Sequence, residues 1–205
     1  MADLFPTDPR RIRDRIRRYE RALQRELDTG DGRDGYGNRY VLGPLYILPG
    51  DVDGALASFD WYVDAYPDDG GEPYQYLTWA LALFRGGRRP EAVRPLCHTM
   101  LQNVYLVPLV LGHQPRRLDI WHGSNWEWPE YAAEVPQALL NLWDDVALQW
   151  AHDVSEHPTV TAKVARYIEI HRKLKDEPRG PRRTALVRES VALRTAPMLQ
   201  RGRGV

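Results

Sequence analysis

The sequence predicts an all-α protein built from a short array of helical hairpins, with further helices packed on either side of the array. Apolar residues recur at three- and four-residue spacing in most segments long enough to form a helix. Stretches rich in glycine and proline separate these segments. Gly43 and Ala80 lie 37 residues apart, as do Ala55 and Ala92, which indicates a repeated unit. We expect the 205 residues to form one domain.

The first predicted element is an amphipathic helix at residues 8–28. Asp8 is a suitable N-cap and Pro9 a suitable first helical residue. The apolar residues that share one face are Ile12, Ile16, Tyr19, Leu23 and Leu27. The glycine-rich stretch that follows, residues 29–38, lacks the spacing of an EF-hand and is predicted to be a flexible loop.

Two helical hairpins are predicted next, within residues 39–112. The first consists of helices at 40–48 and 52–65, joined by a Pro-Gly-Asp turn. The second consists of helices at 74–84 and 90–102, joined by a Gly-Gly turn. A third unit begins at 103–112 but is stopped by the His-Gln-Pro that follows.

Residues of the first hairpin carry a family resemblance. They are Leu42, Gly43, Tyr46, Ala55, Phe59 and Pro67. This pattern resembles the tetratricopeptide repeat, with Arg39 standing where that repeat usually has tryptophan. The resemblance covers residues 39–103 and extends to bacterial members of this superfamily whose roles are largely unassigned. It implies an α-solenoid whose first helices line a concave surface for extended peptides.

The resemblance also implies the residues of that groove, which are Tyr40, Pro44, Ile47, Tyr74, Leu77, Leu81 and Phe84. Family members that bind chaperone tails hold a carboxylate with lysine and asparagine, whereas this groove is apolar and aromatic. A groove of this kind is open to a peptide partner or is filled by one of the chain's own terminal helices; the sequence leaves both alternatives.

Residues 113–136 form the predicted aromatic loop. Its candidate recognition residues are Trp121, His122, Asn125, Trp126, Glu127 and Trp128. Such aromatic side chains suit either a buried strut or a ligand-binding surface. A weaker alternative is a metal site at His113, Asp119 and His122.

Beyond this loop, residues 137–196 are predicted to be a region of C-terminal helices, followed by a basic tail at 197–205; helical spacing of apolar residues is seen over 136–154, 159–174 and 183–194. Both ends of the chain are basic: residues 10–25 carry eight arginines against two acids, and residues 172–205 carry ten basic side chains against three acids. Basic ends suit nucleic acid, an acidic partner or the acidic remainder of the chain.

The sequence contains no recognised catalytic, nucleotide-binding or metal-binding motif. We therefore predict a non-enzymatic adaptor that binds a protein or peptide, with no cofactor, no metal and no membrane span. One alternative is a small enzyme or ligand-binding protein that uses residues 113–131; another is a protein that binds nucleic acid through its basic ends. The single cysteine, Cys97, predicts a cytoplasmic location, and the sequence does not specify an oligomeric state.

Overall fold

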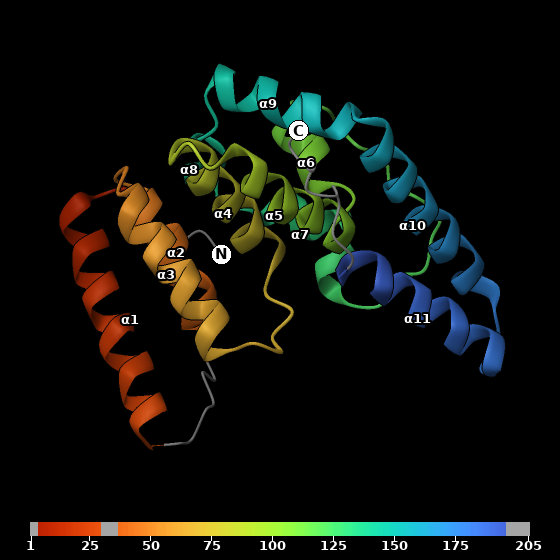
Figure 1. Cartoon of the computed structure of the whole chain (residues 1–205), viewed down its shortest axis with the longest axis horizontal. Coiled ribbons are helices and arrows are strands. Elements are labelled where there is room, and N and C mark those ends of the chain that lie inside the picture. The colour runs from red at the N-terminus through yellow and green to blue at the C-terminus, as the bar shows by residue number, and fades with distance from the viewer. Residues whose placement is uncertain (1–3, 30–36, 196–205) are drawn as a thin grey trace, which may run out of the picture.

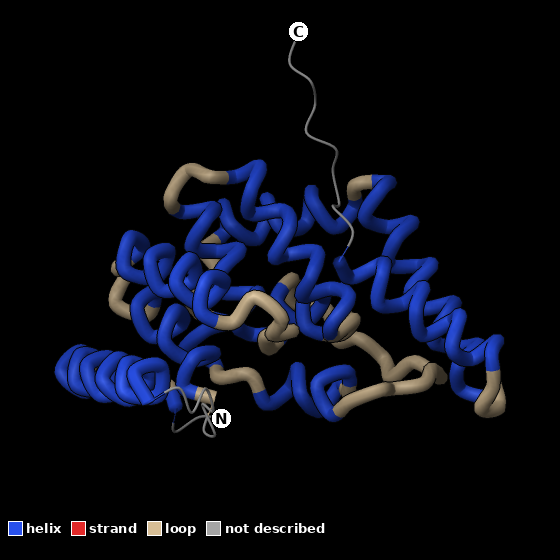
Figure 2. The backbone as a smooth tube through the Cα atoms, turned by 60° about the horizontal axis from the view of Figure 1, so that its bottom comes forward, coloured by secondary structure: helices blue, strands red, loops and turns tan. Residues whose placement is uncertain are grey.

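The computed structural model describes residues 4–29 and 37–195, and within these ranges all regular structure is helical (Figure 2). This confirms the all-α prediction. The elements are α1 (Pro9–Thr29), α2 (Asn38–Ile47), α3 (Val52–Ala65), α4 (Pro73–Arg85), α5 (Arg89–Gln102), α6 (Leu106–Val110), the 3-10 turn η2 (Asn125–Glu127), α7 (Pro129–Glu134), α8 (Gln137–Leu140), α9 (Asp145–Glu156), α10 (Pro158–Asp176) and α11 (Pro181–Thr195). The predicted tail at 197–205 and most of the predicted loop at 29–38 lie outside the described residues.

Helix α1 forms where its cap and apolar spacing predict. The Asp8 carboxylate accepts hydrogen bonds from the backbone amides of Arg10 and Arg11, both at 2.9 Å, so it supplies acceptors for amides at the start of the helix. Four apolar residues of the predicted face are buried, namely Ile12, Ile16, Tyr19 and Leu23. Leu27 remains 37% exposed, so the buried face ends at Leu23, before the last turn of the helix.

The four helices of the predicted hairpins pack in pairs, α2 against α3 and α4 against α5, and α4 also contacts both members of the first pair. Gly43 on α2 faces the ring of Phe59 on α3, which is 1% exposed. Phe59 in turn stacks on Trp79 of α4, with ring centroids 5.4 Å apart. A small residue on one helix thus admits a large one from the next, which is the packing expected from the sequence.

The C-terminal helices are arranged differently from the prediction in one respect. The continuous helix predicted at 136–154 is two helices, α8 and α9, separated at residues 141–144. Asp144 caps the second, because its carboxylate accepts the backbone amide of Ala147 at 2.9 Å. Val146 belongs to the predicted apolar face but is 63% exposed. The buried face of α9 therefore does not continue the apolar face predicted for one unbroken helix.

The elements are arranged with α1 at one end of the molecule and α10 and α11 at the other, as Figure 1 shows. Helix α5 connects the two halves, since it packs on α4 and also contacts α9, α10 and α11. None of the helices in the described ranges is both long enough and apolar enough to cross a membrane.

Candidate functional site

The residues predicted to line a peptide groove belong to the core. Tyr40, Pro44, Ile47, Tyr74, Leu77, Leu81 and Phe84 are all buried. The chain itself provides part of the cover: Phe5 lies edge-on to Tyr74 at a centroid distance of 5.6 Å, and Trp150 of α9 stacks on Phe84 at 4.9 Å. These residues therefore do not form an open groove, and Phe5 and α9 cover part of them.

The aromatic loop is anchored on α5 by one buried side chain. Asn103, at the C-cap of that helix, is 1% exposed. Its amide nitrogen donates to the carbonyl oxygens of Trp126 at 2.6 Å and Trp128 at 3.0 Å. Buried polar groups rarely go without hydrogen bonds, so this amide fixes the path of the loop over the end of α5.

A second anchor is the buried Tyr105, whose hydroxyl accepts the backbone amide of Leu118 at 3.1 Å and lies 3.2 Å from Nε2 of His122. The His122 ring stacks on Trp128 with centroids 4.3 Å apart, and Arg117 covers Trp128 at 4.4 Å. His122 and Trp128 therefore serve mainly as a packed strut. Asn125 is exposed.

The other side of the loop is held by His171 of α10, which is 1% exposed. Its Nδ1 lies 2.8 Å from the carbonyl oxygen of Trp121, and Nε2 lies 2.9 Å from Oγ of Ser190 on α11. A carbonyl can only accept, so Nδ1 carries the proton and Nε2 accepts the hydroxyl of Ser190. Burial lowers the pKa of His171 to about 4, which keeps the ring neutral.

Between the loop and α11 lies a pocket of about 270 Å³. It is lined by Trp121, Gly123, Ser124, Trp126, Glu127, Val187, Ser190 and Arg194. Gly123 leaves room for one of the two indoles, because a Cβ at this position would lie 2.7 Å from the Trp121 ring. We call this space the Trp121–Ser190 pocket.

Glu127 provides the carboxylate of the Trp121–Ser190 pocket and is 9% exposed. One of its oxygens, Oε2, accepts the backbone amide of Gly123 at 2.7 Å. The other, Oε1, lies 4.0 Å from Nη1 of Arg194, which is beyond hydrogen-bonding distance. Burial raises the pKa of Glu127, and the Gly123 amide and the charge of Arg194 offset only part of this effect.

Three of the six predicted loop residues, Trp121, Trp126 and Glu127, meet at this pocket, and the other three do not line it. Sequence reasoning missed the contribution of α11, which places Val187, Ser190 and Arg194 at three- and four-residue spacing on one face. That spacing is visible in the sequence. No pattern in the sequence indicates that this face of α11 packs against a loop about 65 residues earlier in the chain.

The metal site considered at His113, Asp119 and His122 does not assemble. Asp119 pairs with Lys175 at 2.6 Å, His113 is exposed, and the His122 ring is stacked on Trp128. Within the ranges that the structure describes, no three histidine, cysteine or acidic side chains are grouped in a way that would hold a metal ion.

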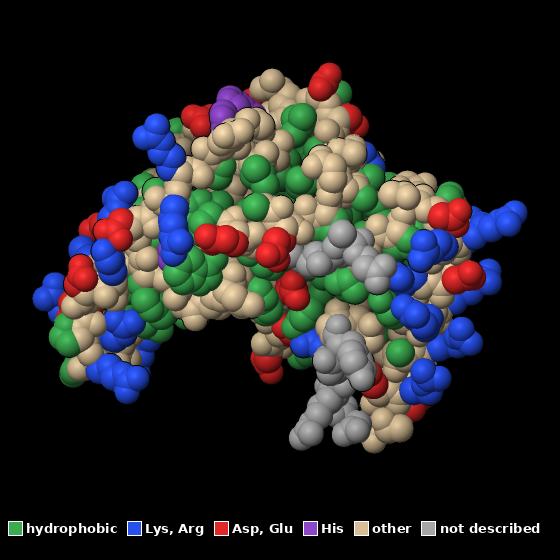
Figure 3. Space-filling model, turned by 180° about the vertical axis from the view of Figure 1, so that it is seen from behind, with side chains coloured by type: hydrophobic (Ala, Val, Ile, Leu, Met, Phe, Trp, Pro, Cys, Tyr) green, Lys and Arg blue, Asp and Glu red, His purple; other side chains and the backbone are tan. Residues whose placement is uncertain are grey.

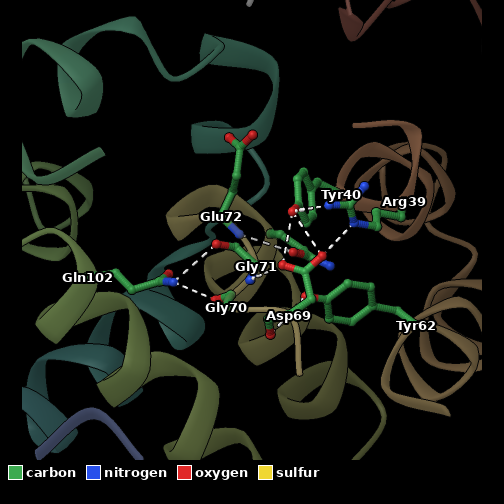
Figure 4. Close-up of polar contacts among 9 residues, drawn as sticks. Arg39, Tyr40, Tyr62, Asp69, Gly70, Gly71, Glu72 and Gln102 are labelled. Atoms are coloured by element: carbon green, nitrogen blue, oxygen red, sulfur yellow. Dashed lines mark hydrogen bonds and ion pairs between the residues drawn. The ribbon is translucent and has the colours of Figure 1, made fainter. Parts of the chain in front are cut away.

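A separate polar cluster fixes the connection between the two hairpins (Figure 4). The Asp69 carboxylate accepts Nε of Arg39 at 2.5 Å, the Tyr40 hydroxyl at 2.9 Å and the Gly71 amide at 3.0 Å. Burial by itself would raise the pKa of Asp69, but these hydrogen bonds outweigh it and lower the pKa. All three hydrogen-bond donors to Asp69 belong to this chain, so the cluster stabilises the packing of α2 against residues 66–72.

The sequence matches none of the protein-family models, and comparisons with curated proteins and with solved structures also found no match.

Proposed function

We propose that this protein is a non-enzymatic adaptor of tetratricopeptide type that binds a protein or peptide partner in the cytoplasm. The sequence pattern at residues 39–103 supports the repeat assignment, as does the contact of Gly43 with Phe59 that the pattern requires. The only cysteine in the sequence, Cys97, is buried and unpaired, which is compatible with a reducing compartment.

The recognition site in this proposal is the Trp121–Ser190 pocket, and its preferred ligand is a lysine or arginine side chain of the partner. The observation that carries this choice is Glu127, a buried carboxylate whose Oε1 accepts no hydrogen bond within the described residues and faces Arg194 only at 4.0 Å. A cation that enters the pocket would restore the interaction that burial removes from this charge.

The indoles beside the carboxylate favour the same ligand. Trp121 and Trp126 line the pocket together with Glu127. A cation over an indole face gains roughly 0.5–2 kcal/mol, and the methylene stem of lysine or arginine packs on the same surface. Arg194 also lines the pocket, with its side chain 29% exposed, so it has solvent into which it can move when a second cation binds.

The proposal is tested by a titration with N-acetyl-arginine methylamide, followed through the indole N–H signals of Trp121 and Trp126 in a nitrogen–proton correlation spectrum. We expect saturable shifts of these two signals, and a loss of affinity of about 10- to 100-fold in Glu127→Gln, which keeps the side-chain shape and removes the charge. N-acetyl-glutamine methylamide is the matched control ligand. Equal shifts with both ligands would count against a cation site.

A second candidate function, acyl transfer, is favoured by one observation. Ser190 lines the pocket with its Oγ 2.9 Å from Nε2 of His171, whose other nitrogen is oriented by the Trp121 carbonyl. This is the arrangement of a nucleophile, a base and an orienting group. In such a reaction Oγ would attack the carbonyl carbon of an ester, its proton would pass to Nε2 and then to the leaving alcohol, and water would hydrolyse the acyl-enzyme.

This candidate predicts that a fluorophosphonate ester labels the native protein at Ser190, which mass spectrometry of the digested protein detects. His171→Gln would abolish labelling, whereas the exposed control His152→Gln would leave it unchanged. Absence of labelling in the folded native protein would leave the Ser190–His171 hydrogen bond as a tie between α10 and α11.

A further inference from the structure

The outer face of α1 carries a stripe of exposed arginines that the pocket does not involve. These residues are Arg10, Arg11, Arg13, Arg17, Arg18, Arg21 and Arg25. They lie on the helix surface away from the buried apolar residues, and we call them the α1 arginine face. Figure 3 shows the corresponding concentration of basic side chains along the edge of the molecule that α1 forms.

The α1 arginine face differs from the C-terminal basic residues in how its charges are compensated. Among the described residues, none of its seven guanidinium groups forms an ion pair with a carboxylate; Arg21, for example, donates to the backbone carbonyl of Arg17 at 3.0 Å. At the C-terminal basic end, by contrast, Lys175 pairs with Asp119 at 2.6 Å and Arg182 with Glu177 at 3.2 Å. The charge of the C-terminal basic end is therefore partly compensated within the described residues, whereas that of the α1 arginine face is not.

The geometry of the face is that of a straight row of charge. Arg10, Arg17, Arg21 and Arg25 fall within an arc of about 80° on the helix at 100° per residue, and the exposed Asp14 is the one acidic residue in this arc between Arg10 and Arg25. They extend over roughly 22 Å of the axis at 1.5 Å per residue. The row lies at the end of the molecule opposite α10 and α11, so a long ligand can approach it without contacting the Trp121–Ser190 pocket (Figure 1).

We propose that the α1 arginine face binds double-stranded nucleic acid through its phosphates, independently of base sequence. A duplex presents a regular row of negative charge, and arginine forms paired hydrogen bonds with phosphate oxygens. The aromatic residue of α1, Tyr19, is buried, so this face offers no ring on which the bases of a single strand would stack.

An acidic peptide fits the same face less well. A peptide gains much of its affinity from apolar side chains that enter pockets. The pocket beside α1, of about 300 Å³, has Glu20 in its wall, and this carboxylate would repel acidic residues of a peptide held there. A duplex contacts the protruding arginines alone and has no need of that pocket.

The test measures fluorescence anisotropy of a labelled duplex of about 30 base pairs with the full chain, between about 50 and 200 mM salt. The test variant replaces Arg10, Arg17, Arg21 and Arg25 with glutamine. The control variant replaces the exposed Arg172, Arg179, Arg182 and Arg188 with glutamine, so that both variants lose four positive charges. Circular dichroism verifies that both remain helical.

We expect the native protein to bind with a steep negative dependence of log K on log salt. The α1 variant should lose about tenfold or more in affinity at the lowest salt, and its slope should fall by about 3 to 4, because each phosphate contact contributes about 0.9. The control variant should bind within about threefold of the native protein. Absence of duplex binding by the native protein, or equal losses in both variants, would overturn the proposal.

A labelled peptide of glutamates and a single-stranded oligonucleotide complete the comparison. Tighter binding of either ligand than of the duplex would also overturn the proposal. Because Arg10→Gln and its companions leave Glu127 unchanged, the arginine-amide titration of the pocket should be the same in native protein and α1 variant. Failure of the duplex experiment and failure of the pocket proposal are therefore distinguishable.

Discussion

Substituting Gly43 with alanine tests the closest approach between α2 and α3. An added Cβ would lie 2.5, 2.6 and 2.9 Å from three ring carbons of Phe59. Carbon atoms prefer separations of about 3.5–4.0 Å, so the ring or the helix would have to move by roughly 1 Å. The ring has little freedom to do so, because it is 1% exposed and its centroid lies 5.4 Å from that of Trp79.

The expected magnitude follows from two opposing contributions. Overpacking in a well-packed core costs about 1–3 kcal/mol, and the rigid position of Phe59 places this case near the upper limit. Replacing glycine by alanine inside a helix by itself stabilises the folded state by about 1 kcal/mol, because alanine has the higher helix propensity. The net loss in the free energy of unfolding should therefore be about 1–2 kcal/mol for Gly43→Ala.

Urea denaturation followed by circular dichroism measures this loss. Gly70→Ala is the matched control, since a Cβ there would meet no atom within 4 Å, and it should change stability by less than about 0.5 kcal/mol. In a double-mutant cycle, Phe59→Leu should relieve part of the cost of Gly43→Ala. A stabilising Gly43→Ala, or strictly additive effects, would refute the reasoning about this contact.

Three further predictions concern buried or partly buried groups. Folding lowers the pKa of His171 from 6.5 to about 4. The contribution of this residue to stability is therefore complete above pH 6.5 and is lost as the pH falls towards 4, by up to about 1.4 kcal/mol per pH unit. In denaturation experiments at several pH values, His171→Asn should reduce this pH dependence of stability, whereas His152→Asn should leave it unchanged. Phe5→Ala should cost about 3 kcal/mol of stability in urea denaturation because the ring covers Tyr74, and a loss under 1 kcal/mol would contradict the assignment of this contact to the core. Asp69→Asn should lower the thermal midpoint through a loss of about 1–3 kcal/mol, since it weakens a partly buried network, and an unchanged midpoint would contradict that role.

Local chemistry accounts for the helices that the sequence predicts well. Helix α3 begins and ends at the predicted residues 52 and 65 because Asp51 caps its first turn, accepting the amide of Gly54 at 2.9 Å, and Pro67 follows its end. The break between α8 and α9 was not predicted, because apolar spacing continues across it from Leu139 to Trp150. Helical periodicity alone does not detect a cap such as Asp144 inside an apolar pattern.

The candidate site depends on contacts between distant parts of the chain, and these limit prediction from sequence. The clustering of Trp121, Trp126 and Glu127 was visible in the sequence, and these residues do meet. Their partners His171 and Ser190 approach only because α10 and α11 pack against the loop, which no local pattern encodes. For the groove residues the sequence left two alternatives, because apolar side chains suit an open groove and a covered core equally well, and in the structure these residues are covered.

The central claim is that the Trp121–Ser190 pocket recognises a basic side chain through Glu127. The most direct measurement is selection of a random peptide library on the native protein, followed by affinity measurements of the selected peptides with Glu127→Gln. The account predicts that lysine or arginine is enriched at one peptide position, and that Glu127→Gln weakens binding by about 10- to 100-fold. Selected peptides without a fixed basic residue, or with unchanged affinity for Glu127→Gln, would contradict it.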